Sequence, residues 1–297
     1  MKKSKFSDTQ ARIEKNRLLM TQTAPTVGNN VFNRIFLAVR LGILRITLYL
    51  HGFRYDRTGG PVSVIRNQAM IRVADSDYEL MLPMQRRVVR YRGGIAWRIA
   101  KLAGRYGCPD FYEPQVGDVV VDVGANIGEF SLYAVSKGAQ VHAFEPDPSA
   151  FACLSHNLRQ FPNAIGYKLA LWSERTTLSF FKATDQADSS FYKPDSQIQE
   201  VIELEAWRLD DVTEIAALER IDFLKIDGEG AEPEILQGAT ETLRRTGRIA
   251  IDVGPERLGE STRDAVIEIL EASGFTIVDH DGNCELIAEN ISLSQPT

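Results

Sequence analysis

Two acidic residues stand at or near the ends of apolar segments, where a carboxylate can bind a ligand. Asp122 lies within the run Val119–Val123, which Gly124 closes, and Glu145 directly follows the run Gln140–Phe144. An acid at the tip of the second strand of a nucleotide-binding sheet accepts hydrogen bonds from ribose hydroxyls. Glu145 therefore predicts a ligand that contains an adenosine-like group.

The loop after the first of these segments argues against a dinucleotide. It reads Asp122-Val123-Gly124-Ala125-Asn126-Ile127-Gly128. A dinucleotide fingerprint needs G-x-G-x-x-G, so that a pyrophosphate can lie on a helix N-terminus. Here glycines stand only at 124 and 128, and the acid at 122 would face a diphosphate badly. A cofactor with a cationic end and no phosphate fits better, and S-adenosylmethionine carries an ammonium and a sulfonium group.

Further acids follow the apolar run Ile221–Ile226. Asp227 ends this run, and Glu229 and Glu232 come next. We expect Asp227 and Glu229 in the active site, as a general base, as a ligand of an acceptor hydroxyl or as a metal ligand. Glu232 is better explained by the dipole at the start of a helix. Metal dependence is not expected, because no further ligand cluster accompanies these acids.

Alternating strands and helices must position these residues. We expect core strands at Val119–Val123, Gln140–Phe144, Ala164–Leu171, Ile221–Ile226 and Arg248–Val253, with helices at 127–137, 148–160, 232–245 and 262–273 and a closing pair at Phe275–Val278 and Glu285–Ala288. This alternation predicts an α/β fold with a mostly parallel sheet, in which ligands bind beyond the carboxyl ends of the strands. Asp210 and Asp211 are expected to cap the helix that follows them.

Four motifs in this order resemble the FkbM family of methyltransferases. They are Asp122–Gly128, Phe144-Glu145-Pro146, Leu209-Asp210-Asp211 and Leu224–Glu232. The resemblance covers about residues 111–252 and departs from the commoner family pattern at Gly228 and Pro233, neither of them a charged position. It implies the class I methyltransferase Rossmann-like fold with an antiparallel closing strand. It also implies S-adenosylmethionine as cofactor and, usually, O-methylation of hydroxyls on natural products or glycans.

The site residues expected from these motifs lie at the carboxyl ends of the strands. Cofactor binding is assigned to Asp122, Gly124, Asn126, Gly128, Glu145, Pro146 and Leu171, and catalysis to Asp227 and Glu229. Phe191 and Tyr192, in a polar loop, could stack on a sugar or ring. Two alternatives stay open: a nicotinamide-dependent oxidoreductase and a non-catalytic cofactor-binding protein of the same fold. The acids on the acceptor side argue against the second.

The chain is expected to have three parts. Residues 1–30 form a flexible tail, residues 31–106 an N-terminal helical and β appendage, and residues 107–291 the methyltransferase domain. Arginines interrupt the apolar stretch 31–53, so it predicts an amphipathic helix and not a membrane span. That helix could dock on its own domain, on a dimer partner or on a membrane surface. The basic segment 86–106 is either a solvated helix face or an anion-facing surface near the substrate.

Charge and cysteine content limit the partners. A net charge of -6 and a pI near 5.4 make a poor generic nucleic-acid binder. The three cysteines show no zinc-type spacing and are expected to be reduced thiols in a cytoplasmic protein. A saccharide, glycolipid or secondary metabolite is the expected acceptor, and peripheral membrane contact and a homo-oligomer stay open.

Overall fold

The computed structural model describes residues 64–65, 70–74, 79–83, 90–91, 93–183, 190–192, 198–278 and 285–294. The expected tail 1–30 and amphipathic helix 31–53 lie outside these residues. Within them, no helix combines the length and the apolar character that a membrane crossing needs.

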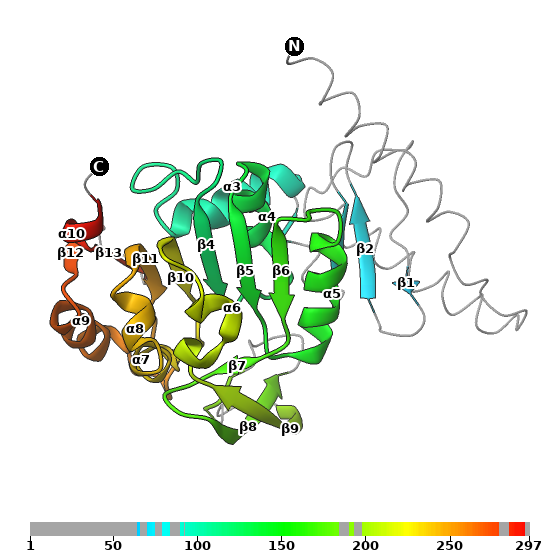
Figure 1. The fold of residues 1–297 in the computed structure, drawn as a ribbon. Coiled ribbons are helices and arrows are strands. Elements are labelled where there is room, and N and C mark those ends of the chain that lie inside the picture. The colour runs from blue at the N-terminus through cyan, green and yellow to red at the C-terminus, as the bar shows by residue number, and fades with distance from the viewer. Residues whose placement is uncertain are drawn as a thin grey trace, which may run out of the picture.

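A seven-stranded sheet forms the centre of the fold (Figure 1). Its strands, in spatial order, are β12 (Thr276–Val278), β13 (Glu285–Glu289), β11 (Thr246–Asp252), β10 (Ile221–Ile226), β4 (Val119–Val123), β5 (Gln140–Phe144) and β6 (Ala164–Tyr167). All neighbours pair in parallel except β13, which runs antiparallel to both β11 and β12. The predicted class I methyltransferase sheet, mostly parallel with an antiparallel closing strand, is therefore confirmed.

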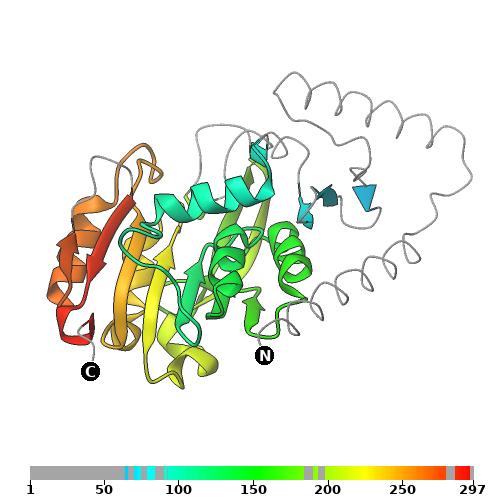
Figure 2. The ribbon, with the colours of Figure 1, turned by 90° about the horizontal axis from the view of Figure 1, so that it is seen from above.

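Two hydrophobic cores cover the two faces of this sheet. One face packs against α3 (Ile95–Arg105), α4 (Glu129–Ser136) and α5 (Pro148–Leu158), and the other against α6 (Thr213–Ala216), α7 (Glu232–Gln237), α8 (Thr240–Leu243) and α9 (Arg263–Ala272) (Figure 2). Side chains alternate between the faces of a strand. Val120 accordingly belongs to the first core and Val121 to the second, which explains why the strand is apolar throughout.

The segment before the central sheet shares the first core. A small antiparallel sheet joins β1 (Val64–Ile65), β2 (Met70–Ala74) and β3 (Glu79–Leu82). Asn157 of α5 accepts a hydrogen bond from the main chain of Met81 at 2.8 Å and donates one back at 3.1 Å. Ile95, Ile99 and Ala103 of α3 are buried in the same core. The boundary placed at residue 107 thus falls within continuous packing.

Two expected elements are divided in the structure. The segment 164–171 forms β6 and then β7 (Ala170–Leu171), which leaves the main sheet and pairs with β9 (Ile198–Trp207), itself paired with β8 (Thr176–Ala183). The segment 232–245 breaks into α7 and α8. A Cβ atom at Gly238 would lie 2.0 Å from the carbonyl oxygen of Trp172, so only glycine allows this close approach.

The break between α7 and α8 also explains an incorrect prediction. Asp210 accepts hydrogen bonds from the N–H groups of Glu241 (3.0 Å) and Thr242 (2.8 Å), so it caps α8. It does not cap α6, the helix that directly follows it, where no side chain caps the N-terminus. The prediction that Asp210 caps the helix directly after it was wrong. The N–H groups that donate to its side chain belong to a segment about 30 residues later in the chain.

Candidate active site

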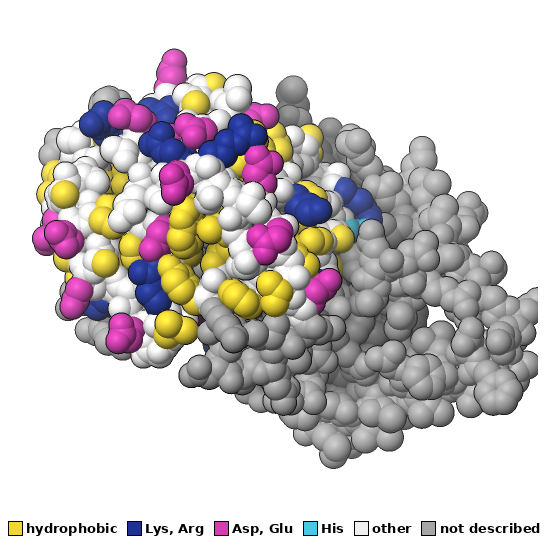
Figure 3. Space-filling model, turned by 90° about the horizontal axis from the view of Figure 1, so that it is seen from below, with side chains coloured by type: hydrophobic (Ala, Val, Ile, Leu, Met, Phe, Trp, Pro, Cys, Tyr) yellow, Lys and Arg dark blue, Asp and Glu magenta, His cyan; other side chains and the backbone are white. Residues whose placement is uncertain are grey.

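A pocket opens at the carboxyl ends of β4, β5 and β10. Here the chain turns from β4 to β5 on one side, while β10 pairs with β4 on the other, so the strand order reverses. Ligands bind at such reversals in open α/β sheets. The pocket is lined by Pro83, Val123, Gly124, Asn126, Phe144, Glu145, Pro146, Asp147, Ser149, Ala150, Leu169, Leu171, Phe180, Ser190, Phe191, Asp227, Gly228, Glu229 and Ile235. Apolar side chains, with charged ones around them, lie on the face of the molecule seen in Figure 3.

The loop after β4 contains two glycines with different roles. Gly124 has φ +69°, and a Cβ atom there would lie 1.8 Å from the carbonyl oxygen of Asp227. The glycine therefore allows the loops after β4 and β10 to touch. Gly128 has φ +90°, and a Cβ atom there would lie 2.7 Å from Leu154 of α5. Gly128 allows α4 to pack closely on α5 and is not part of the pocket wall.

Glu145 joins two loops and lines the pocket. Its carboxylate accepts hydrogen bonds from the N–H groups of Asn126 (2.7 Å) and Asp147 (2.8 Å). Burial raises the pKa of Glu145 to about 7, against the opposing effect of these two hydrogen bonds. A carboxylate has about four acceptor positions, so each oxygen can accept a further hydroxyl. Pro146 lines the pocket beside it.

An apolar wall stands next to Glu145. Leu171, Phe180 and Phe191 all line the pocket. The ring centroid of Phe191 lies 5.0 Å from that of Phe180 and 5.9 Å from that of Trp172. The hydroxyl of Tyr192 instead contacts Arg257, whose guanidinium lies 4.4 Å from the tyrosine ring centroid. Of the two loop aromatics, the structure therefore places only Phe191 on the pocket wall.

Asp227 and Glu229 both line the pocket, as the sequence predicts for the acids after β10. Oδ2 of Asp227 accepts a hydrogen bond from the hydroxyl of Tyr106 at 2.8 Å. Glu229 has φ +51°, a left-handed conformation that turns the chain sharply at this point. The two predicted catalytic acids are thus brought to the same wall.

Glu232 holds the loop that carries these acids. One oxygen accepts hydrogen bonds from the N–H groups of Gly228 (3.0 Å) and Gly230 (2.9 Å). The other accepts one from the hydroxyl of Thr262 at 2.9 Å. Burial raises the pKa of Glu232, although these hydrogen bonds oppose the change. Glu232 lies at the start of α7, as expected, and its side chain also fixes the preceding loop.

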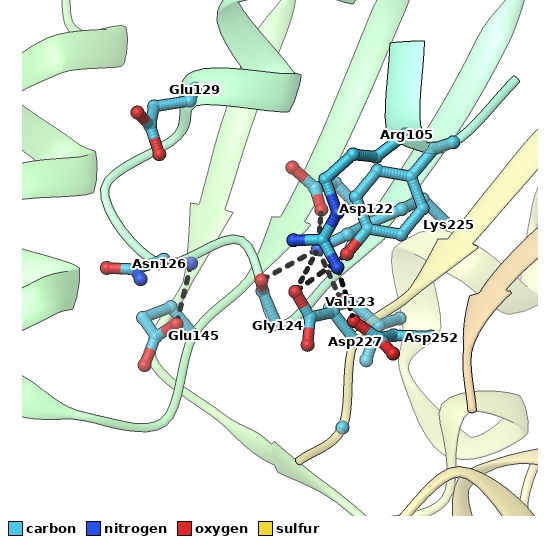
Figure 4. A network of polar contacts seen from close by, with 12 residues as sticks. Arg105, Asp122, Val123, Gly124, Asn126, Glu129, Glu145, Lys225, Asp227 and Asp252 are labelled. Carbon is cyan, nitrogen blue, oxygen red and sulfur yellow. Dashed lines mark hydrogen bonds and ion pairs between the residues drawn. The ribbon is translucent and has the colours of Figure 1, made fainter. Parts of the chain in front are cut away.

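Asp122 lies beneath the pocket and not on its wall. Its side chain is fully buried, accepts a hydrogen bond from Ser131 at 2.6 Å and forms an ion pair with Lys225 at 3.1 Å. The Lys225 ammonium also donates to the carbonyl oxygen of Gly124 at 2.8 Å and lies 3.8 Å from Asp227 (Figure 4). Asp122 therefore affects the loop after β4 through Lys225.

Lys225 was not predicted as a functional residue. Burial alone would lower its pKa, but Asp122 and Asp227 outweigh this effect and raise it. A signal was present in the sequence, because a lysine in a strand buried on both faces must find carboxylate partners. Lys225 is the only cation in the apolar run 221–226.

Arg105, the last residue of α3, connects this helix to β11 and β13. It forms an ion pair with Asp252 at 3.0 Å and another with Glu285. Burial raises the pKa of Asp252 to about 6, and the nearby Asp227 contributes to the increase. Arg98 pairs similarly with Glu129 at 2.7 Å. These two arginines of the basic segment are thus paired with acids of the domain, which neither expectation for that segment included.

The described part of the chain contains no group of three His, Cys, Asp or Glu side chains that could hold a metal ion.

Comparison with known proteins identifies the family of this chain. The methyltransferase FkbM domain matches residues 122–279, more than half of the chain. The 31-O-demethyl-FK506 methyltransferase FkbM of Streptomyces tacrolimicus is 30% identical, over 56% of this chain and 75% of that protein. The 2-O-methyltransferase NoeI of Sinorhizobium fredii is 25% identical, over 64% and 86%. The hexuronic acid methyltransferase AglP of Haloferax volcanii is 29% identical, over 53% and 65%.

The match begins at Asp122 and includes the loop after β4, Glu145 and the acids after β10. It sets aside the nicotinamide-dependent alternative, which the glycine spacing had already disfavoured. The chain belongs to the FkbM family of S-adenosylmethionine-dependent methyltransferases.

Proposed function

We propose that this methyltransferase acts on a hydroxyl group of a saccharide or secondary metabolite, with Asp227 as the group that accepts the hydroxyl proton. The observation that carries the proposal is the position of Asp227 on the pocket wall. Gly124 lies between Asp227 and Glu145, so the acceptor side and the ribose side flank the same loop (Figure 4). The names of two relatives specify O-methylation, and a third names a sugar acid as the substrate.

The residues of the pocket suit the cofactor. Glu145 would accept hydrogen bonds from the ribose hydroxyls, because its buried carboxylate faces the pocket and has acceptor positions beyond those that Asn126 and Asp147 use. Leu171, Phe180 and Phe191 would flank the adenine. Gly124, Asn126 and Pro146 would line the remaining contact surface, and Gly128 and Asp122 would keep the loop in place from below. When bound, S-adenosylmethionine supplies an electrophilic methyl group whose bond to a sulfonium sulfur breaks as the new bond forms.

The acids after β10 would act on the acceptor. A hydroxyl becomes a better nucleophile when a general base removes its proton during attack, typically by a factor of about 100 to 10,000. Asp227 would take this proton, while Glu229 would bind a neighbouring hydroxyl and orient the acceptor. Lys225 and Tyr106 keep Asp227 in place, and the apolar wall excludes water from the reacting groups. Correct alignment of the two reactants supplies a further part of the rate.

A labelled-methyl screen tests this proposal. Purified protein is incubated with S-adenosylmethionine carrying an isotope-labelled methyl group and with a panel of saccharides, glycolipids and polyhydroxylated metabolites. Asp227→Asn should reduce turnover at least about 100-fold while S-adenosylhomocysteine binding stays near the wild-type value. Glu241→Gln, which changes an exposed acid of α8, serves as the matched control and should leave both quantities unchanged. Wild-type turnover in Asp227→Asn would refute the assignment of the base.

A further inference from the structure

Tyr106 connects the segment before the FkbM domain to the pocket. It follows directly on α3 and lies 16 residues before the first residue of the family match. Its side chain is fully buried, and its hydroxyl donates a hydrogen bond to Oδ2 of Asp227 at 2.8 Å. A residue outside the family domain therefore contacts the acid to which we assign proton transfer.

The position of the Tyr106 ring is strongly constrained. The ring packs edge-on against Phe130 of α4, with centroids 5.7 Å apart. The Lys225 ammonium lies 5.1 Å from the ring centroid. The preceding residue, Arg105, fixes the end of α3 through its ion pairs with Asp252 and Glu285. The ring of Tyr106 is thus held by contacts to α4 and β10, and the adjacent Arg105 ties the end of α3 to β11 and β13.

A hydrogen-bond donor and a cation both lie close to one oxygen of Asp227. The Tyr106 hydroxyl lies 2.8 Å from Oδ2, and the Lys225 ammonium lies 3.8 Å from the same atom. The side chain of Asp227 is 24% exposed and reaches the pocket wall, where an unrestrained carboxylate could rotate. Contacts to one oxygen restrict that rotation and leave the other oxygen, Oδ1, for the acceptor.

We propose that Tyr106 is a positioning residue for methyl transfer: its hydroxyl holds the Asp227 carboxylate in the orientation that receives the acceptor proton. The residue at the end of α3, before the FkbM domain, then completes the active site. This inference rests on the proposed function of Asp227. It adds a role for part of the chain that the family match does not cover.

The chain offers a matched control for a purely structural role. Tyr112 is also buried, and its hydroxyl donates a hydrogen bond to Oδ2 of Asp118 at 2.7 Å. Its ring stacks on Phe223, with centroids 4.6 Å apart. Neither Tyr112 nor Asp118 lines the pocket. Tyr106→Phe and Tyr112→Phe therefore remove the same kind of hydrogen bond from the same core, but only one of them at the site.

The experiment compares these two variants of the full chain. Both should fold, with similarly small decreases in melting temperature, and both should bind S-adenosylhomocysteine as the wild type does. With an acceptor from the labelled-methyl screen, only Tyr106→Phe should lower kcat, by about tenfold, with the KM for S-adenosylmethionine unchanged.

Crystal structures with S-adenosylhomocysteine provide a readout that needs no acceptor. The Asp227 carboxylate should move or adopt several orientations in Tyr106→Phe and stay in place in Tyr112→Phe. An unmoved carboxylate in Tyr106→Phe, or a kcat equal to that of Tyr112→Phe, overturns the inference. If Asp227→Asn keeps the wild-type rate, the proposed function fails; if Asp227→Asn is inactive while Tyr106→Phe is unaffected, only the inference fails.

A second pair of variants applies if Tyr106→Phe does not fold. Replacing Tyr106 with 4-aminophenylalanine keeps a donor at the same place, whereas 4-fluorophenylalanine has a similar size and cannot donate. The amino variant should retain most of the wild-type rate, and the fluoro variant should lose about tenfold. Equal rates in the two variants overturn the inference.

Discussion

The main-chain N–H of Asn126 donates a hydrogen bond of 2.7 Å to the carboxylate of Glu145. The acid after β5 therefore holds the loop after β4, in addition to facing the pocket. The same carboxylate accepts a hydrogen bond from Asp147, which begins the turn into α5. Loss of the Glu145 charge should thus disturb both the ribose contact and the loop beside it.

Glu145→Gln should weaken S-adenosylhomocysteine binding by about 10- to 100-fold, the range expected for lost hydrogen bonds to a charged group. The amide nitrogen of glutamine is itself a donor, so it would face a hydrogen-bond donor at a position where the carboxylate oxygen accepts. Isothermal titration calorimetry measures the effect. Glu203→Gln serves as the control, because Glu203 is a surface acid of β9 that accepts a hydrogen bond from Ser179. Unchanged affinity in Glu145→Gln would remove the ribose assignment.

Cofactor binding should depend on pH because burial raises the pKa of Glu145 to about 7 in the unliganded protein. The ribose hydroxyls donate hydrogen bonds, so they require the ionised carboxylate, and binding below this pKa must release a proton. Affinity should therefore increase from about pH 6 to about pH 8 and then level off. Calorimetry in buffers of different ionisation enthalpy would detect the released proton; affinity that falls as pH rises through this range contradicts the assignment.

Gly124→Ala should prevent correct formation of the pocket. The added Cβ would lie 1.8 Å from the carbonyl oxygen of Asp227, which is main chain and cannot rotate away. We expect a loss of more than about 3 kcal/mol in the free energy of unfolding, together with lost cofactor binding. Gly117→Ala is the matched control, because Gly117 also has a positive φ but has no atoms within 4 Å of the added Cβ.

The control separates backbone strain from the steric clash. Gly117→Ala should cost only about 1–2 kcal/mol, as expected for alanine in a left-handed conformation, and should retain cofactor binding. Chemical denaturation of both variants measures the difference. Similar losses in the two variants would show that the contact between Gly124 and Asp227 is not the reason for the glycine.

Arg105→Met should destabilise the protein because Asp252 and Glu285 are buried carboxylates that lose their common cation. Removal of one partner of a buried ion pair costs about 3–5 kcal/mol; since the Arg105 side chain is 45% exposed, we expect about 2 kcal/mol. Arg244→Met, which breaks an exposed pair with Glu241, should cost less than about 0.5 kcal/mol. Equal losses of stability in Arg105→Met and Arg244→Met, measured by urea denaturation, would contradict a structural role for Arg105.

The Arg105→Met penalty should also depend on pH. The pKa of Asp252 is raised to about 6 in the folded protein, and Arg105 opposes that increase. Without Arg105 the pKa of Asp252 in the folded protein rises further. The variant therefore loses additional stability as pH rises from the pKa of Asp252 in the folded wild type to its pKa in the folded variant. The difference from the wild type should therefore be larger at about pH 8 than at about pH 5. A difference that shrinks as pH rises would contradict this.

The sequence predicted the central strands and the acids at their ends because apolar runs, glycines and acids are local signals. Val119–Val123 and Gln140–Phe144 have the bounds expected, and Asp227 and Glu229 reach the pocket. The contact that holds Asp227 is long-range, from Tyr106, and so is the cap that Asp210 provides for α8. No local pattern encodes them, since each depends on how distant segments pack.

The buried charges were only partly predictable for the same reason. Asp122 stands in an apolar strand, so a ligand and an internal cation explain it equally well until its partner is known. The structure identifies Lys225 as that partner, at 3.1 Å. The break at Gly238 was also hidden, because it depends on the carbonyl oxygen of Trp172 about 65 residues earlier in the chain.

The most direct test of the account follows an isotope-labelled methyl group from S-adenosylmethionine into a hydroxyl-bearing acceptor, with wild type and Asp227→Asn side by side. The wild type should form S-adenosylhomocysteine and a methyl ether in equal amounts, as determined by mass spectrometry and NMR. Asp227→Asn should bind S-adenosylhomocysteine normally and form almost no ether. Label on nitrogen or carbon, or an undiminished rate in Asp227→Asn, would contradict base-assisted O-methylation at this site.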